Sequence, residues 1–209
     1  MKYGQLDIAH RRRSHRIFED ILRAYSNSSS PRILDVGCAF GVIGALRGNS
    51  VNIYGIERDP KLLRLAQKNC QKVYQLDLND PDLNAIKESG FDFIFCGDIV
   101  EHVIAPCLLL KNLQRLLSPQ GYLVISVPNI AQLPYRIRLF LGNFDYQETG
   151  VLDRTHLHLY TYKTALALIE GSGFEIVKFF PSGTIVSYVN IFPNLLASQF
   201  IFLCKKRPS

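Results

Sequence analysis

Short apolar runs alternate along most of this chain with segments that have the periodicity of a helix. The apolar runs cover residues 32–36, 52–57, 72–77, 92–97 and 121–127, and helical patterns cover residues 41–46, 60–68, 83–89 and 108–117. Ser118-Pro119-Gln120-Gly121 predicts a helix stop and a turn before the fifth run. The runs consist almost entirely of Ile, Val, Leu and Phe, which indicates strands buried on both faces. The pattern therefore predicts an α/β protein with a parallel sheet between layers of helices.

The segment before the first strand has the pattern of an amphipathic helix. Residues 15–25 place one apolar face on Ile17, Ile21, Leu22 and Tyr25. Such a face needs a partner, and the sheet is the nearest apolar surface. We therefore expect residues 1–30 to form a helical cover over the sheet.

The alternation pauses after the fifth strand, over residues 129–161, which are rich in Arg, aromatic residues and His. We expect this segment to be an insertion on the substrate side of the protein. A helix is predicted at residues 162–172, and strands at 175–180 and 198–205 bring the strand total to seven. A length of 209 residues fits one domain over residues 1–209.

Composition sets further limits on the class of protein. It is ordinarily globular, which excludes a disordered, collagen-like or coiled-coil chain. A net charge of +6 permits an anionic partner without requiring one. Five cysteines at no C-x-x-C spacing are typical of free thiols in a reducing compartment, and the charged residues 1–15 lack the apolar core of a signal peptide. We therefore expect a cytoplasmic protein.

The longest apolar stretch, residues 184–203, is about as long as a membrane span. It is interrupted by Asn190, Pro193, Asn194 and Gln199. We interpret it as a strand, a turn and a strand, so no membrane span is expected, although peripheral membrane contact stays open.

Acidic residues follow three consecutive strands at the point where each strand ends. The turn Asp35-Val36-Gly37-Cys38-Ala39-Phe40-Gly41 follows the first strand and opens a helix, Glu57 ends the second strand, and Asp77 ends the third. An open α/β sheet binds nucleotides at this edge, and an acid about 20 residues after the turn can accept hydrogen bonds from ribose hydroxyls. Each acid alone would also suit a helix cap. Together they favour a nucleotide site.

The turn also limits which nucleotide can bind. A dinucleotide's pyrophosphate is usually held by G-x-G-x-x-G, whereas Gly37, Gly41 and Gly44 have a different spacing. The carboxylate of Asp35 would repel a pyrophosphate but would attract an ammonium group. Adenosine carrying a cationic amino-acid tail therefore fits best, with a nicotinamide-dependent oxidoreductase as the alternative enzyme.

From Ile33 to Lys205 the chain resembles the class I S-adenosylmethionine-dependent methyltransferases. The turn is similar to their D-x-G-x-G-x-G motif, with Ala39 in place of the middle glycine. The resemblance implies a Rossmann-like, seven-stranded, mostly parallel sheet and S-adenosyl-L-methionine as cofactor, with S-adenosyl-L-homocysteine as product. It also implies which residues bind the cofactor: the methionine tail is bound by Asp35, Gly37, Cys38, Ala39 and Gly41, the ribose by Glu57, and the adenine by Arg58, Asp77 and Leu78.

Two segments point to subgroups within this family. The run from Asp98 to His102 resembles the D-x-x-E-H segment of ubiquinone-biosynthesis O-methyltransferases, which implies that Asp98 lines the cofactor site. Residues 126–129 and 150–161 are similar to bacterial methyltransferases of cell-envelope glycan pathways and, more loosely, to methionine-biosynthesis protein W. The acceptor is accordingly expected to be a small molecule, such as a quinone-like compound, a sugar or an envelope-glycan precursor, methylated on oxygen. A non-catalytic module that binds the cofactor is the other alternative.

Two histidines are candidates for the base that an acceptor hydroxyl needs. His102 follows the fourth strand, and His156 lies in the expected insertion. Either can instead orient a neighbouring helix or loop. A metal site of Asp153, His156 and His158 is the less favoured alternative, because no further ligand is fixed by local spacing, and no metal is predicted.

Two basic segments are candidate binding surfaces. Tyr135, Arg136, Arg138, Phe140 and Phe144 can meet an anionic or sugar-like acceptor, although a solvated amphipathic helix is the favoured explanation. The basic run at residues 10–16 is short and lacks any RNA-binding module, so no nucleic acid partner is expected. The sequence leaves the oligomeric state open.

Overall fold

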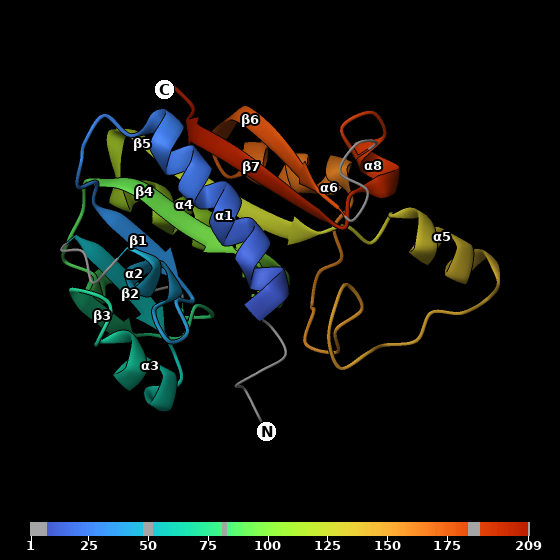
Figure 1. Ribbon diagram of the computed structural model, residues 1–209, viewed down its shortest axis with the longest axis horizontal. Coiled ribbons are helices and arrows are strands. Elements are labelled where there is room, and N and C mark those ends of the chain that lie inside the picture. Colours follow the sequence, from blue (N-terminus) through green and yellow to red (C-terminus); the bar gives the residue numbers. More distant parts are fainter. Residues whose placement is uncertain (1–7, 48–51, 81–82, 184–188, 209) are drawn as a thin grey trace.

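The computed structural model describes residues 8–47, 52–80, 83–183 and 189–208, and these form one seven-stranded sheet with helices on both faces (Figure 1). The strand order is β3-β2-β1-β4-β5-β7-β6. The strands are β1 (Ile33–Val36), β2 (Ile53–Glu57), β3 (Lys72–Gln75), β4 (Phe91–Gly97), β5 (Leu117–Pro128), β6 (Phe174–Ser182) and β7 (Gln199–Lys206). The predicted seven-stranded α/β fold is confirmed.

Strand direction follows the predicted mostly parallel pattern. Strands β1 to β5 pair in parallel, and only β7 runs antiparallel to its two neighbours, β5 and β6. Because β1, β2 and β4 are parallel neighbours, their carboxyl ends meet at one edge of the sheet. The acidic residues that follow these strands therefore lie at a common edge.

The helices and short 3₁₀ turns connect the strands. The helices are α1 (Ile8–Tyr25), α2 (Val42–Leu46), α3 (Pro60–Ala66), α4 (Pro106–Leu116), α5 (Leu133–Phe140), α6 (Tyr162–Gly171) and α8 (Pro193–Leu196). The 3₁₀ turns are η1 (Leu83–Ala85) and η2 (Val100–His102). None of the helices in the described part of the chain is long and apolar enough to span a membrane.

Alternate strand residues face the two helical layers, as the period of a strand requires. Ile33, Phe93 and Val124 pack on one face with Phe18 and Ile21 of α1. The intervening residues face a second cluster that contains apolar side chains of α4 and α6: Leu34, Ile94, Leu123, Leu110 and Ile169. Both faces of the central strands are thus buried, and α1 covers the sheet diagonally (Figure 1).

Two local predictions are wrong. Instead of a helix over residues 83–89, the described chain forms only the single 3₁₀ turn η1 and then an irregular connection from Ile86 to β4. The segment Ser118–Gly121 lies inside β5, where the pairing shifts from Phe91 with Leu117 to Phe93 with Tyr122. The extra residues bulge out of the strand rather than forming a separate turn.

The apolar stretch at residues 184–203 is described only in part. The first predicted strand falls mainly on residues 184–188, which lie outside the described chain, and the short helix α8 lies where the turn was predicted. Pro193 is at the first helical position, where a missing N–H group costs nothing. The second predicted strand is present as β7.

Residues 129–161 leave the sheet after β5 and return to it before α6. Their ends are tied together by a bridge between Asn129 and Tyr160, with the amide of Ile130 donating to the Tyr160 carbonyl at 3.0 Å. The buried Asn129 side chain donates to the carbonyl of Ala197 at 2.8 Å. Helix α5 lies at the far end of this excursion, away from the sheet (Figure 1).

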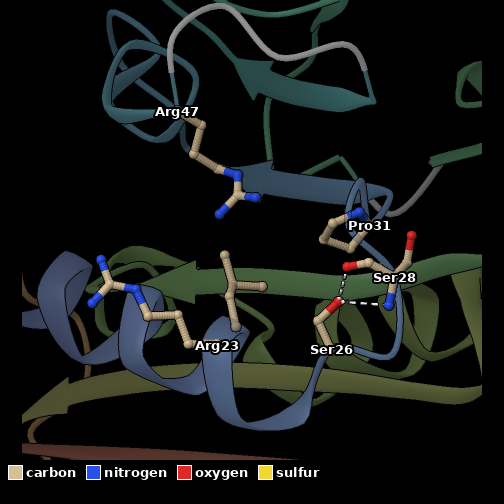
Figure 2. A pocket seen from close by; sticks show the side chains of 6 residues that line it. Arg23, Ser26, Ser28, Pro31 and Arg47 are labelled. Carbon is tan, nitrogen blue, oxygen red and sulfur yellow. Dashed lines mark hydrogen bonds between the residues drawn. The ribbon is translucent and has the colours of Figure 1, made fainter.

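A small hollow of about 180 Å³ lies at the opposite edge of the sheet, where the chain passes from α1 into β1. Figure 2 shows Arg23 and Ser26 from the end of α1, Ser28 and Pro31 from the connection, and Arg47 from the end of α2. Because Pro31 precedes β1, this hollow is at the amino ends of the strands. It is therefore separate from the edge that carries the acidic residues.

Candidate functional site

The turn between β1 and α2 is built from backbone conformations that favour glycine. Gly37, Ala39 and Gly41 have φ values of 71°, 50° and 79°. A Cβ atom on Gly37 would lie 2.2 Å from Cδ1 of Ile99, so a larger residue would have to displace the Ile99 side chain as well as adopt a strained backbone. Ala39 adopts the left-handed region despite its side chain, which is unfavourable for an L-residue. The turn thus presents its backbone to the edge of the sheet.

Glu57 supports this turn from the end of β2. Its Oε2 accepts a hydrogen bond from the amide of Ala39 at 3.0 Å, and its Oε1 accepts one from the amide of Asp59 at 2.8 Å. A carboxylate has about four acceptor positions. Glu57 can therefore hold the turn and still accept hydrogen bonds from two further hydroxyl groups.

Cys38 and Asp35 lie beneath the turn. The Asp35 side chain is buried, as is the Cys38 thiol. The pKa of Cys38 is raised, first by its hydrogen bond with Cys70, then by burial and by the charges of Asp35 and Glu57. Asp35 and Glu57 are thus both close enough to act on the same thiol, which remains protonated.

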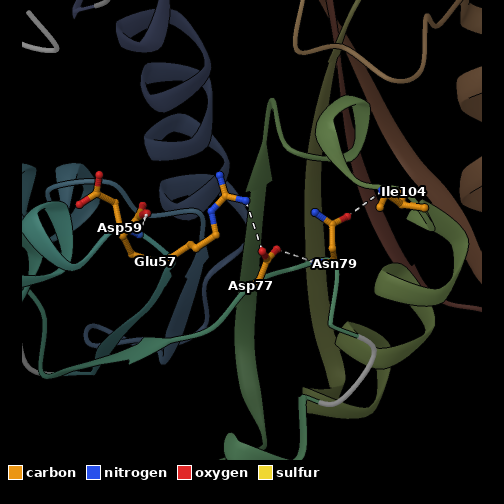
Figure 3. Close-up of polar contacts among 6 residues, drawn as sticks. Glu57, Asp59, Asp77, Asn79 and Ile104 are labelled. Carbon is orange, nitrogen blue, oxygen red and sulfur yellow. Dashed lines mark hydrogen bonds and ion pairs between the residues drawn. The ribbon is translucent and has the colours of Figure 1, made fainter. Parts of the chain in front are cut away.

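Asp77 and Asn79 extend the site along the loop after β3 (Figure 3). Asp77 pairs with Arg58, with Nη1 and Oδ2 3.3 Å apart, and its Oδ1 accepts from the amide of Asn79 at 3.0 Å. The Asn79 side chain accepts from the amide of Ile104 at 2.8 Å. The Asn79 amide, followed by Arg58, lowers the pKa of Asp77. Leu78 packs against the sheet's core between these two polar residues.

Asp98 follows β4 and is held by two residues that the sequence did not indicate. Its backbone is left-handed, with φ of 54°. Gln199 of β7 donates from Nε2 to both carboxylate oxygens, at 2.6 and 2.8 Å, and Ser126 of β5 donates from Oγ to Oδ1 at 3.1 Å. Only the sheet order, in which β5 pairs with β4 and β7 pairs with β5, reveals these contacts.

Residues 129–161, the insertion, are hydrogen-bonded to η2, the segment that follows Asp98. The amides of Leu157 and His158 donate to the carbonyl of Glu101 at 2.7 and 3.1 Å. This contact brings His156 beside His102, with ring centroids 4.7 Å apart. The two predicted catalytic histidines, 54 positions apart in sequence, therefore meet at the carboxyl edge of the sheet.

Hydrogen bonds fix the proton position in both rings. Nδ1 of His156 lies 2.9 Å from the carbonyl of Val151, and Nδ1 of His102 lies 3.2 Å from the carbonyl of Thr155. Since a carbonyl can only accept, each Nδ1 carries a proton, and Nε2 is the nitrogen that can accept a proton or bind a metal when the ring is neutral. The pKa of His102 is lowered, mainly by burial, against the effect of the Thr155 carbonyl. His102 is therefore neutral near pH 7.

The residues suited to holding a metal differ from the set considered from the sequence. Within the described residues, Glu101, His102 and His156 each offer one ligand atom, and these atoms lie within 4.8 Å of one another. His158 instead directs Nε2 to the carbonyl of Val103 at 3.0 Å. Asp153 accepts hydrogen bonds from the amide and hydroxyl of Thr155.

The fold and this edge together define a class I methyltransferase, since the sheet order with one antiparallel strand and the glycine-rich turn after β1 occur together. A family model described as a methyltransferase domain matches residues 8–178. The chain therefore belongs to this family of S-adenosylmethionine-dependent methyltransferases.

Individual relatives agree with this assignment. The ubiquinone biosynthesis O-methyltransferase of Rickettsia prowazekii is 29% identical over 151 residues, which cover 68% of this chain and 59% of that protein. This chain thus spans about three fifths of that relative's length. A methyltransferase structure from Archaeoglobus fulgidus has a TM-score of 0.63 at 19% identity, covering 92% of this chain and 94% of that one. One from Mesorhizobium loti has a TM-score of 0.64 at 19% identity, covering 90% and 96%.

The residues at the carboxyl edge fit S-adenosylmethionine. The Glu57 carboxylate retains acceptor positions for ribose hydroxyls. The ionised Asp77 and the adjacent Leu78 offer a polar and an apolar contact to a purine ring. The nicotinamide alternative is set aside, because the family uses S-adenosylmethionine.

Proposed function

We propose that this methyltransferase transfers a methyl group to a hydroxyl oxygen of a small molecule. The observation that carries the proposal is the contact of the insertion with Glu101, which sets His102 and His156 side by side next to the cofactor edge. S-adenosylmethionine supplies a methyl group on a sulfonium whose sulfur leaves as a neutral thioether. The chain must then align the acceptor oxygen with that methyl group and remove the hydroxyl proton.

The cofactor roles proposed for the individual residues follow from their positions. We assign the methionine tail to Asp35, Gly37, Cys38, Ala39 and Gly41, the ribose to Glu57, and the adenine edge to Arg58, Asp77 and Leu78. Asp98 would line the site between the tail and the histidines, because it follows β4 directly. The hydrogen bonds that fix Glu57 and Asp98 support these roles, since fixed acceptors can bind a ligand without reorganising.

A base at Nε2 of His102 or His156 suits this reaction. A neutral imidazole with its Nδ1 proton fixed presents Nε2 as the acceptor for the hydroxyl proton. As the proton moves to Nε2, the acceptor oxygen forms its bond to the methyl carbon and the carbon–sulfur bond breaks, leaving its electron pair on sulfur. The contact between the two rings supports this role, as do the hydrogen bonds from Nδ1 of His102 to the Thr155 carbonyl and from Nδ1 of His156 to the Val151 carbonyl.

The acceptor has a candidate pocket in the insertion. A hollow of about 250 Å³ is lined by Ile130, Ala131, Tyr135, Arg136, Leu139 and Phe144. The Tyr135 hydroxyl approaches Gly150, and the next residue, Val151, accepts the hydrogen bond from His156. The hollow is smaller than a typical drug-sized site. An apolar lining with one arginine favours a single ring that carries a polar or anionic group.

The acceptor classes that fit are a quinone-like ring, a sugar and an envelope-glycan precursor. The similarity to ubiquinone biosynthesis O-methyltransferases and the apolar lining both favour the first. A cytoplasmic location and the single-domain organisation stay predictions from the sequence.

Methyl transfer can be tested with S-adenosylmethionine carrying a labelled methyl group and a panel of catechols, hydroquinones and sugar nucleotides. We expect label on an oxygen of one phenolic acceptor, identified by mass spectrometry. His156→Asn should lower the turnover number by about 10²- to 10⁴-fold without changing the affinity for S-adenosylhomocysteine. Label found on nitrogen or carbon, or a rate insensitive to both histidines, would contradict the proposal.

A further inference from the structure

Three potential metal ligands meet where the insertion contacts the sheet edge. Glu101 and His102 belong to η2, which follows β4, whereas His156 belongs to the insertion. One ligand atom from each lies within 4.8 Å of the other two. The backbone bonds from Leu157 and His158 to the Glu101 carbonyl hold the two segments together independently of these side chains.

Glu101 is the member of the cluster that most needs a partner. Its side chain is 1% exposed, and within the described residues neither carboxylate oxygen has a hydrogen-bond partner. Buried polar groups in native proteins are nearly always paired, and an isolated buried carboxylate is strongly unfavourable. A proton or a cation must therefore neutralise Glu101.

The histidines are oriented as metal-bound histidines usually are. Each donates its Nδ1 proton to a backbone carbonyl, that of Thr155 or that of Val151, which leaves Nε2 with a lone pair. The Thr155 hydroxyl also lies 3.1 Å from Nδ1 of His102, and its own proton goes to Asp153. Such bonds from the second ring nitrogen fix the tautomer and orientation of a ligating imidazole.

We propose that Glu101, His102 and His156 form a binding site for a divalent transition metal, with Zn²⁺ as the ion that suits these donors best. Two imidazole nitrogens and one carboxylate oxygen are a known three-ligand set for Zn²⁺, with bonds of about 2.0–2.2 Å and one position left open. Tetrahedral bonds of that length place donor atoms about 3.3 Å apart. The observed separations of up to 4.8 Å are larger than this, so metal binding requires the three ligand atoms to move closer together.

Two neighbouring residues stay outside the proposed site. The Asp153 carboxylate is occupied by Thr155, and the Nε2 atom of His158 faces the carbonyl of Val103. In the sequence His156-Leu157-His158, His156 is therefore a proposed ligand, whereas His158 is hydrogen-bonded to the backbone. This arrangement offers a matched control on the same segment.

A metal here would join the insertion to the core and alter the chemistry of the edge. Its open position can take the oxygen of an acceptor hydroxyl, whose pKa the cation lowers, so that the proton leaves to solvent before the methyl group is accepted. The two histidines then hold the metal instead of accepting the proton. This catalytic role rests on the proposed function, whereas metal binding itself does not.

The test uses the full chain after treatment with a chelator, titrated with ZnCl₂ in a calorimeter and followed by its melting temperature. We expect one Zn²⁺ per chain and a rise in melting temperature. Glu101→Gln and His156→Asn should each weaken binding by at least 10-fold. The side-chain amide introduced by His156→Asn can still donate to the Val151 carbonyl, so this change removes the ligand while keeping the local hydrogen bond. His158→Gln should bind Zn²⁺ as the unaltered chain does.

Co²⁺ provides a second measurement, because its visible absorption reports the coordination geometry. Four-coordinate absorption that is lost in His156→Asn and kept in His158→Gln supports the site. The proposal is overturned if Zn²⁺ and Co²⁺ do not bind, or if the ligand variants bind as tightly as the unaltered chain. It is also overturned if His158→Gln loses binding equally. None of these outcomes depends on finding the methyl acceptor, so a failed methyl-transfer assay leaves the metal result intact.

Discussion

Gln199, the first residue of β7, donates from its side-chain amide to both carboxylate oxygens of Asp98, which lies 101 positions earlier in the chain. The contact exists because β5 lies between β4 and β7, so that the start of β7 is at the same edge as the end of β4. Asp98 has a left-handed backbone, which favours glycine, aspartate or asparagine. Gln199 thus fixes a carboxylate at a strained position beside the proposed cofactor site.

Replacing Gln199 by Met, which has a similar size and no amide, should release Asp98. A hydrogen bond to a charged group contributes about 1.5–3 kcal/mol. We expect the free energy of unfolding to fall by about 2 kcal/mol in urea denaturation, and the KM for S-adenosylmethionine to rise. Ser126→Ala removes two longer hydrogen bonds with Asp98, from Ser126 Oγ to Oδ1 and from the Asp98 amide to Ser126 Oγ, both of 3.1 Å, and should have a smaller effect on both quantities. Equal effects of the two changes would show that Gln199 does not position Asp98.

Glu57→Ala should weaken binding of S-adenosylhomocysteine by about 1 to 3 kcal/mol, the loss expected for hydrogen bonds to a charged group. The substitution also leaves the amides of Ala39 and Asp59 without their acceptor. Isothermal titration calorimetry measures the affinity directly. Asp59→Ala is the matched control, because it removes the cap of α3 and about 1 kcal/mol of stability without touching the proposed ribose site. Unchanged affinity in Glu57→Ala would refute the ribose role.

Ala39→Gly should stabilise the protein slightly. Left-handed backbone costs an L-residue about 1–2 kcal/mol, and glycine loses about 0.4–1 kcal/mol through its freer unfolded chain. The difference predicts a gain of about 0.5 kcal/mol in the free energy of unfolding. Ala45→Gly, in the exposed part of α2, should lower it by about 1 kcal/mol instead. Thermal denaturation of the two variants distinguishes these opposite signs.

Asp77 should contribute a pH-dependent part of the stability. Its pKa is lowered from the ordinary value of 3.8, first by the Asn79 amide and then by Arg58. The unfolded chain therefore binds its proton at a higher pH than the folded chain does. This contribution is complete above the unfolded pKa and is lost as pH falls through the folded one. Asp77→Asn should reduce stability at pH 6 more than at pH 3, and parallel pH curves for the two proteins would contradict this.

The sequence predicts the sheet well, because buried parallel strands leave an unbroken apolar signal. All seven strands lie within a few residues of their predicted positions, and the edge that carries Glu57 and Asp77 follows from strand direction alone. The errors fall where local pattern and tertiary packing disagree. The polar Ser118–Gly121 segment signals a turn, yet Leu117 is already paired with Phe91 across the sheet.

A site residue can be predicted from the sequence only where its position at the end of a single strand is enough to identify it. Glu57 ends a predicted strand and Asp98 directly follows one, so both could be selected as site residues from the sequence. Gln199 could not, because its contact with Asp98 depends on the position of the antiparallel strand β7, which no local pattern reports. The two histidines could be chosen as chemical types, but their meeting depends on amides of residues 157 and 158 reaching the Glu101 carbonyl. The burial of Glu101, which makes it a metal-ligand candidate, is likewise a product of packing and not of sequence pattern.

Filling the hollow beside α5 should separate acceptor binding from cofactor binding. Ala131→Phe places a ring in the space of about 250 Å³ that we propose for the acceptor. We expect the KM for the acceptor identified in the labelling assay to rise at least 10-fold, because the ring and the acceptor exclude each other, while affinity for S-adenosylhomocysteine is unchanged. Ser28→Phe, in the hollow of about 180 Å³ at the opposite edge of the sheet, should leave both quantities unaltered. If Ala131→Phe keeps the original KM, the acceptor binds elsewhere, and if both variants lose activity, the effect comes from general destabilisation.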